Sequence, residues 1–293
     1  MIRSTFRLTP GIGPWLESRL WDFGLRTWDD LLAAPPGSTP LSERAEARLR
    51  DAVVRARELL ESGDAERLAV MLPRAERWRL YPELVDQACF LDVETDGDER
   101  LTAVGLLDAE GPRVLLAGRD LDELPERAAR WKLLVTYNGL AFDVPALERA
   151  FRGWRAPLAH VDLCHLWRRL GHRGGLKLLE KEVGVRRPAH LDGLTGLDAV
   201  RLWQAWLDGD AAALRLLVEY NLHDAVDLRP LADLGYNRMV ERLRLPAPLV
   251  RVAELGDFRY DVTKFLESLL PLPPRGKGPR SLLPLPHRGR GPG

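Results

Sequence analysis

The sequence of 293 residues is short of three things: cysteine, net charge and long apolar runs. Its two cysteines, Cys89 and Cys164, cannot make a disulfide framework, and cysteine pairs with zinc-binding spacing are absent, so a reducing compartment is expected. Proline, glycine or charge interrupts each apolar stretch before it reaches the length of a membrane span. These absences predict a cytoplasmic protein that is neither secreted nor embedded in a membrane.

The net charge of the chain does not by itself indicate what the protein binds. The 43 basic residues equal the 43 acidic ones, so the chain lacks the global positive excess that by itself indicates nucleic-acid binding. A nucleic-acid partner therefore has to be argued from local sites. The hydrophobic content of 45% over this length is enough to form a core without cross-links, and the length corresponds to one large domain with smaller additions.

The periodicity of apolar residues changes along the chain from helical to strand-like. After a helical first part, three short strand-like runs follow one another in hairpin succession, and further strands then alternate with helices. This order predicts an α/β fold with a mixed five-stranded sheet flanked by helices, preceded by an all-helical region. We divide the chain into an N-terminal element (1–35) whose Gly11-Ile12-Gly13 turn resembles that of a helix-hairpin-helix module, a helical connector (36–85), the α/β domain (86–245), a C-terminal extension (246–267) and a repeated Pro/Gly/Arg tail that is predicted to be disordered (268–293).

Two acids on the first predicted strand are the strongest chemical signal. Alternate side chains of a strand share a face, so Asp92 and Glu94 point the same way, opposite to Leu91 and Val93. Like charges about 4 Å apart repel by roughly 4 kcal/mol at an effective dielectric constant near 20. Acids in an apolar strand are therefore expected to become protonated or to bind a divalent cation, and binding of a cation is favoured.

Two further patterns carry acids where a strand or a helix ends near the same edge. Asn138 and Asp143 follow a buried strand, and Tyr220 and Asp224 share one face of a late helix because they are four residues apart. Each has a plainer interpretation, in which Asp143 caps the following helix and Asp224 is a solvated helix charge. Asp96 either joins a metal site or faces solvent in its turn, and solvent is favoured.

Together these motifs resemble the DEDDy exonucleases of the ribonuclease H-like superfamily, in particular the YprB-like predicted exonucleases. The resemblance covers residues 74 to 234. It rests on Asp-x-Glu-Thr, on Asn-x3-Phe-Asp, on Tyr-x3-Asp, on the lead-in Trp78–Leu84 and on the Leu-Lys helix within Gly175–Glu180.

The resemblance implies a divalent-metal-dependent 3′-5′ exonuclease that cleaves phosphodiester bonds by a two-metal mechanism. Asp92, Glu94, Asp143 and Asp224 would hold two Mg²⁺ or Mn²⁺ ions, and Tyr220 would orient or help to deprotonate the attacking water. The expected partner is single-stranded or 3′-ended nucleic acid. The alternatives are a structure-selective endonuclease of the same superfamily and a catalytically inactive nucleic-acid-binding module.

Substrate contacts are expected from several smaller features. Asn138, Thr95 and Lys177 are candidates near the acids, and Arg173 is a second candidate point charge for phosphate, although a solvated helix face is an equal interpretation of Lys177 and Arg173. The turn with Gly11 and Gly13 resembles a helix-hairpin-helix hairpin, whose backbone N–H groups grip a DNA phosphate, so DNA is favoured over RNA. The set His160, Asp162 and His165 is either a minor metal site or a border of the active-site groove.

Overall fold

A computed structural model of the chain describes residues 1–254. The predicted tail and most of the predicted C-terminal extension therefore lie outside the described residues. The α-helices of the described part are α1 (Pro14–Asp22), α2 (Trp28–Ala33), α3 (Glu43–Glu61), α4 (Ala65–Met71), α5 (Tyr81–Leu84), α6 (Leu124–Ala128), α7 (Asp143–Ala150), α8 (Leu163–Arg169), α9 (Leu176–Val183), α10 (Gly196–Leu207), α11 (Ala211–Val226) and α12 (Leu228–Leu243). Short 3₁₀ turns are η1 (Ile2–Ser4), η2 (Arg74–Leu80), η3 (Val85–Gln87), η4 (Leu121–Glu123) and η5 (Ala189–Leu191).

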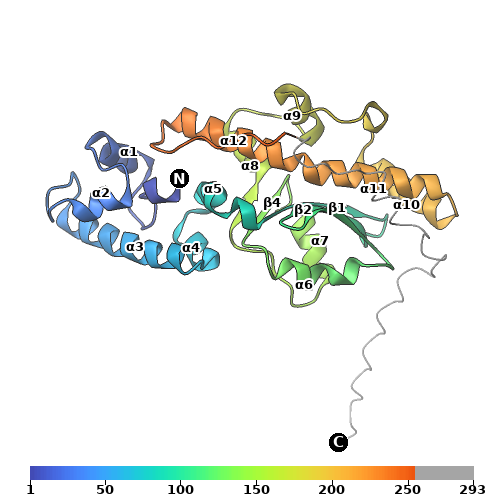
Figure 1. Ribbon diagram of the computed structural model, residues 1–293, viewed down its shortest axis with the longest axis horizontal. Coiled ribbons are helices and arrows are strands. Elements are labelled where there is room, and N and C mark those ends of the chain that lie inside the picture. Colours follow the sequence, from blue (N-terminus) through green and yellow to red (C-terminus); the bar gives the residue numbers. More distant parts are fainter. Residues whose placement is uncertain (255–293) are drawn as a thin grey trace, which may run out of the picture.

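A single mixed sheet forms the centre of the molecule (Figure 1). Its strands are β1 (Ala88–Thr95), β2 (Leu101–Asp108), β3 (Gly111–Leu116), β4 (Leu133–Thr136) and β5 (His160–Asp162), in the spatial order β3-β2-β1-β4-β5. The first three strands pair antiparallel through short turns, whereas β4 and β5 pair parallel beyond β1 because helices connect them. The predicted mixed five-stranded sheet with flanking helices is confirmed.

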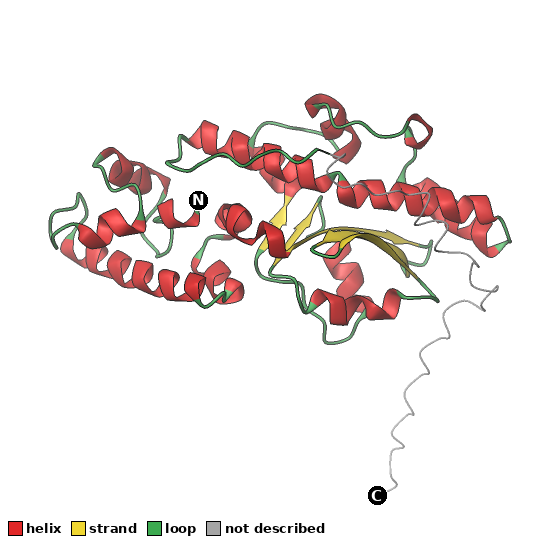
Figure 2. Cartoon of the chain, viewed as in Figure 1, coloured by secondary structure: helices red, strands yellow, loops and turns green. Residues whose placement is uncertain are grey.

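Helices cover both faces of the sheet (Figure 2). Leu91 and Val93 of β1 pack into a core with residues of α6 and α7, while Phe90 packs into the core beneath α11 and α12. Strand alternation then places Asp92 and Glu94 on the α11 face, as predicted. Because both faces of β1 are covered, these two acids are held between the sheet and a helix rather than in open solvent.

Helix α11 approaches the sheet closely enough to require a glycine beneath it. Gly105 of β2 is the pairing partner of Asp92. A Cβ atom at Gly105 would lie 2.5 Å from the carbonyl oxygen of Asn221, which no side chain tolerates. The missing side chain therefore lets α11 bring its polar residues next to the acids of β1.

Helices α2, α3 and α4 of the N-terminal region begin at side-chain caps. Thr27 accepts a hydrogen bond from Asp30 N–H in a reciprocal capping box, as its place in the sequence predicts. Helix α3 begins at Glu43 with Ser42 as its cap. The sequence predicts a start at Thr39, with Pro40 at the first helical position, and this boundary is wrong: Thr39 lies before the helix, and its hydroxyl donates a hydrogen bond to Glu46 at 2.7 Å.

The turn in front of α1 has the backbone that its glycines predict. Gly11 adopts a φ of +95°, Gly13 is the N-cap of α1, and Pro14 occupies the first helical position. Within residues 1–254, the element before this turn is the 3₁₀ turn η1 rather than an α-helix. The hairpin therefore joins an extended segment to α1, and its assignment as a helix-hairpin-helix-like element stays a prediction.

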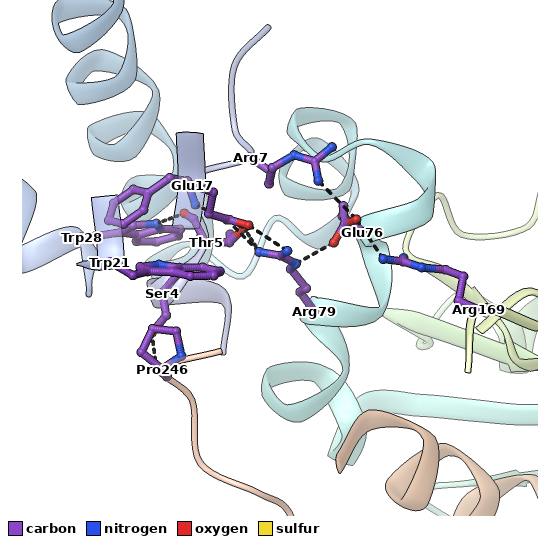
Figure 3. A network of polar contacts seen from close by, with 11 residues as sticks. Ser4, Thr5, Arg7, Glu17, Trp21, Trp28, Glu76, Arg79, Arg169 and Pro246 are labelled. Carbon is purple, nitrogen blue, oxygen red and sulfur yellow. Dashed lines mark hydrogen bonds and ion pairs between the residues drawn. The ribbon is translucent and has the colours of Figure 1, made fainter. Parts of the chain in front are cut away.

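A buried ionic network joins the N-terminal helices to the sheet domain (Figure 3). The Arg79 side chain, 2% exposed, donates to Glu17 at 2.7 and 2.9 Å and to Glu76 at 2.7 Å. Arg7 and Arg169 reach the same Glu76 from the two sides, each at 3.3 Å. The lead-in segment that contains Arg79 thus fixes one part of the molecule to the other.

No helix within residues 1–254 has both the length and the hydrophobicity needed to cross a membrane.

Candidate active site

Three carboxylates from two distant parts of the chain meet above the centre of the sheet. Asp92 and Glu94 come from β1 and Asp224 from α11, and one oxygen of each lies within 4.8 Å of the others. The plainer interpretation of Asp224 as a solvated helix charge is wrong, because this side chain is buried. The predicted convergence of these three acids is therefore what the fold produces.

The fourth predicted acid, Asp143, lines the same groove as the other three. It is the first residue of α7, where the N-cap is Phe142 and no side chain caps the helix, so its interpretation as a cap is wrong. Its side chain is buried, and its Oδ1 atom has no hydrogen-bond partner in the described part of the chain. A buried carboxylate oxygen without a hydrogen-bond partner destabilises the folded protein unless a cation binds to it.

The acids raise one another's pKa. Burial, followed by the charges of Asp224 and Asp143, raises the pKa of Glu94 to about 8. Burial is also the main reason why the pKa of Asp143 is about 7, and why that of Asp92 is well above its ordinary value. Such a cluster is unstable as four free carboxylates and is stabilised by divalent positive charge.

Two side chains of α11 complete the acidic centre. Asn221, which is fully buried, donates its Nδ2 proton to Asp92 Oδ2 at 2.9 Å. Tyr220 is buried one turn before Asp224, and burial together with the charge of Asp224 raises its pKa. The predicted role of Tyr220, to orient or help to deprotonate the attacking water, stays a prediction.

Lys177 of α9 stands beside the tyrosine. Its Nζ donates to the Tyr220 hydroxyl at 2.8 Å, lies 4.3 Å from the centre of the tyrosine ring and also donates to the Leu194 carbonyl. Burial lowers the pKa of Lys177. The ammonium group is thus held between the tyrosine and the acids, where it opposes the rise in the pKa of Glu94.

Three residues outside the predicted set form a second ionic group with Asp224. The Arg187 guanidinium, 4% exposed, pairs with Asp224, with Glu180 at 2.6 Å and with Asp227 at 3.5 Å. No local pattern in the sequence marks Arg187, because its partners lie on α9 and α11, which only the tertiary fold brings together. This arginine thus places a buried positive charge directly on Asp224.

The end of β4 forms a strained turn at the edge of the groove. Asn138 has a φ of +64°, and a Cβ atom on Gly139 would lie 2.3 Å from Thr136 Oγ1. Asp162 fixes this turn by accepting N–H bonds from Asn138 at 2.9 Å and from Leu140 at 3.1 Å. The turn points Asn138 into the groove.

The histidine set does not form a metal site. The carboxylate oxygens of Asp162 accept hydrogen bonds from backbone N–H groups. The His160 ring forms a hydrogen bond with the Thr136 hydroxyl at 2.9 Å, and His165 is exposed. These side chains do not converge on one point within residues 1–254. Asp96 likewise bonds its own turn, accepting from Asp98 N–H and Arg100 N–H at 2.9 Å each.

The four acids and Tyr220 line one groove of about 550 Å³. The candidate substrate residues Thr95, Asn138 and Lys177 line it together with the four acids and Tyr220. Gly11 and Gly13 do not, because they line a separate hollow with Arg7 and the end of α4. The fold therefore gathers the acids and three of the five predicted substrate residues at one place.

Comparison with known proteins identifies the family. Residues 89–236 match the model of the RNase H superfamily, which covers about half of the chain and includes all four acids. The chain belongs to this superfamily, and that membership indicates a nuclease that acts on nucleic acid. No curated protein matches the chain, and no solved structure matches it.

Proposed function

We propose that the protein is a 3′-5′ exonuclease that hydrolyses phosphodiester bonds of nucleic acid and depends on divalent metal ions. The observation that carries this proposal is the gathering of four carboxylates in one groove next to Tyr220, where burial raises the pKa of Asp92, Glu94 and Asp143. The resemblance of these five residues to the DEDDy motifs supports removal of nucleotides from a 3′ end.

The carboxylates fit a pair of hard cations. Asp92, Glu94 and Asp224 present oxygens within 4.8 Å of one another, and Asp143 adds a buried oxygen without a partner. Oxygen ligands without cysteine or histidine suit Mg²⁺ or Mn²⁺ better than zinc. When bound, such ions lower the pKa of water and stabilise the charge that develops on a leaving oxygen.

The other groove residues position the substrate. The Tyr220 hydroxyl accepts a hydrogen bond from Lys177 at 2.8 Å and lines the groove beside Asp224, where it would contact an attacking water molecule or a phosphate oxygen. Asn138 presents its amide on a turn that Asp162 holds rigid, and Thr95 ends the strand that carries two of the acids. These side chains would hold the 3′ terminal nucleotide over the carboxylates. The N-terminal turn with Gly11 and Gly13 supports DNA as the substrate.

The test is digestion of a 5′-labelled single strand in Mg²⁺ or Mn²⁺. The full-length chain is expected to shorten the strand in single-nucleotide steps from its 3′ end, and D92A and D224A are expected to lose this activity. A matched control is Asp51→Asn, because Asp51 is an exposed acid on α3, far from the groove in sequence and in the fold. Unchanged activity in D92A or D224A refutes the proposal.

Two controls separate the alternatives. A circular single strand has no end, so its cleavage indicates an endonuclease of the same superfamily. Equal binding of a strand in Mg²⁺ and in EDTA, with no product in Mg²⁺ or in Mn²⁺, indicates a binding module that has lost catalysis. The exonuclease predicts an intact circle and metal-dependent products.

A further inference from the structure

The active-site groove continues beyond the acids into a second hollow. This hollow has a volume of about 870 Å³ and shares four lining residues with the first one: Tyr137, Asn138, Gly175 and Leu176. Its remaining lining consists of Cys164, Arg168, Gly174 and Arg173. A molecule that occupies the acidic groove can therefore extend past Asn138 into a space whose charged residues are both arginines.

The two arginines have no acidic partner. Both side chains are exposed, and within residues 1–254 neither guanidinium forms an ion pair or a hydrogen bond. Arg187 and Arg79, by contrast, are buried against acids. Arg168 lines the hollow beside Tyr137 and Cys164, and its charge opposes the rise in the pKa of both groups that burial causes.

The segment that carries Arg173 is anchored on both sides. Before it, His172 is buried and its Nδ1 pairs with Glu182 at 2.7 Å. After it, the Gly174 carbonyl accepts a hydrogen bond from Tyr137 Oη at 2.6 Å, and a Cβ atom at Gly174 would lie 2.5 Å from the Leu178 side chain. Arg173 thus projects from a fixed backbone rather than from a loose loop.

The geometry points to a phosphate-binding subsite for the nucleic-acid strand on the 5′ side of the bond that is cleaved. The strand leaves the carboxylates past Asn138, and its next phosphates contact Arg168 and Arg173. Arginine presents a planar fork of donors that fits phosphate oxygens and does not read sequence. This inference rests on the proposed exonuclease function and adds to it a requirement for several nucleotides of substrate.

The test compares a small substrate with a long one. The p-nitrophenyl 5′-ester of thymidine monophosphate reaches only the carboxylates, whereas a single-stranded DNA of about 12 nucleotides also fills the second hollow. In the double variant Arg168→Gln, Arg173→Gln, hydrolysis of the ester is expected to stay within about twofold of the unmodified protein. The KM for the 12-mer is expected to rise at least tenfold at 0.1 M salt, with kcat little changed. Arg242→Gln, which removes an exposed charge from α12, is the matched control.

A binding measurement keeps this test independent of turnover. Fluorescence anisotropy of the labelled 12-mer in Ca²⁺ is expected to show the same tenfold loss of affinity. The dependence of log affinity on log salt is expected to fall by about 0.7 for each phosphate contact removed. If the unmodified protein hydrolyses neither substrate, the proposed function fails, and the anisotropy result still decides whether the subsite exists. Equal affinity of the double variant and the control overturns the subsite, as does an equal loss of hydrolysis for the ester and the 12-mer.

Discussion

Glu94→Gln tests the electrostatics of the site without testing catalysis. Glu94 is 7% exposed and lies within reach of two other acids on β1 and α11. Burial and the charges of Asp224 and Asp143 raise its pKa from 4.5 to about 8. Unfolding exposes the carboxyl to water and restores the lower value.

The expected size of the effect follows from this difference. A carboxyl whose pKa is raised by folding binds more protons in the native state, so the metal-free protein loses stability as the pH rises from 4.5 towards 8. At pH 7 the pH lies about 2.5 units above the ordinary pKa of a glutamate. At 1.36 kcal/mol per unit, the ionisable Glu94 therefore lowers the free energy of unfolding by about 3 kcal/mol. Glutamine is neutral in both states, so E94Q removes this cost at pH 7 and changes little near pH 4.

Urea denaturation in EDTA measures this directly. The free energy of unfolding of E94Q minus that of the unmodified protein is expected to grow by about 1.4 kcal/mol per pH unit between pH 5 and pH 8. In Mg²⁺ we expect the unmodified protein to be more stable than E94Q, because only the unmodified protein gains stability from the ion. Parallel pH profiles of the two proteins in EDTA would refute the reasoning, since they would show that Glu94 ionises as freely in the folded state as in the unfolded one.

Three other substitutions test other contacts. Gly105→Ala places a methyl group 2.5 Å from the Asn221 carbonyl and is expected to lower the free energy of unfolding by about 1–3 kcal/mol, measured by urea denaturation; an unchanged midpoint contradicts the close approach of α11. Arg79→Leu leaves Glu17 buried without its partner and is expected to cost about 3–5 kcal/mol in the same assay, whereas a surface pair would cost less than 1. Tyr220→Phe removes the hydroxyl of a buried phenol and is expected to lower kcat about 100-fold while Mn²⁺ affinity stays unchanged; loss of both would assign the tyrosine to metal binding.

Much of the fold could be predicted because its signals are local. The strand runs are short, apolar and separated by turns, and strand alternation alone places Asp92 and Glu94 on one face. The start of α3 differs from the sequence prediction, which places it at Thr39, whereas the helix begins at Glu43 after the Ser42 cap. A hydrogen bond between Thr39 and Glu46, at 2.7 Å, favours the later start.

The acids of the candidate site could be predicted from the sequence, but the residues that hold these acids in place could not. Motif spacing indicates Asp224, whereas its pairing with Arg187 depends on a connection that runs from α9 towards α10 and returns to α11. The bond from Asn221 to Asp92 joins residues 129 positions apart, and it exists only because Gly105 lets the helix approach the sheet. Such contacts have no local signature, since each depends on where two elements cross.

The most direct measurement is a calorimetric titration of Mn²⁺ into the metal-free, full-length protein at pH 8. Because the carboxylates lose protons as the ion binds, we expect saturable binding accompanied by proton release. This binding should be lost in D92N and retained in Asp51→Asn. Absence of saturable binding by the unmodified protein, or equal binding by D92N, would contradict the proposal that these gathered acids form a divalent-metal site.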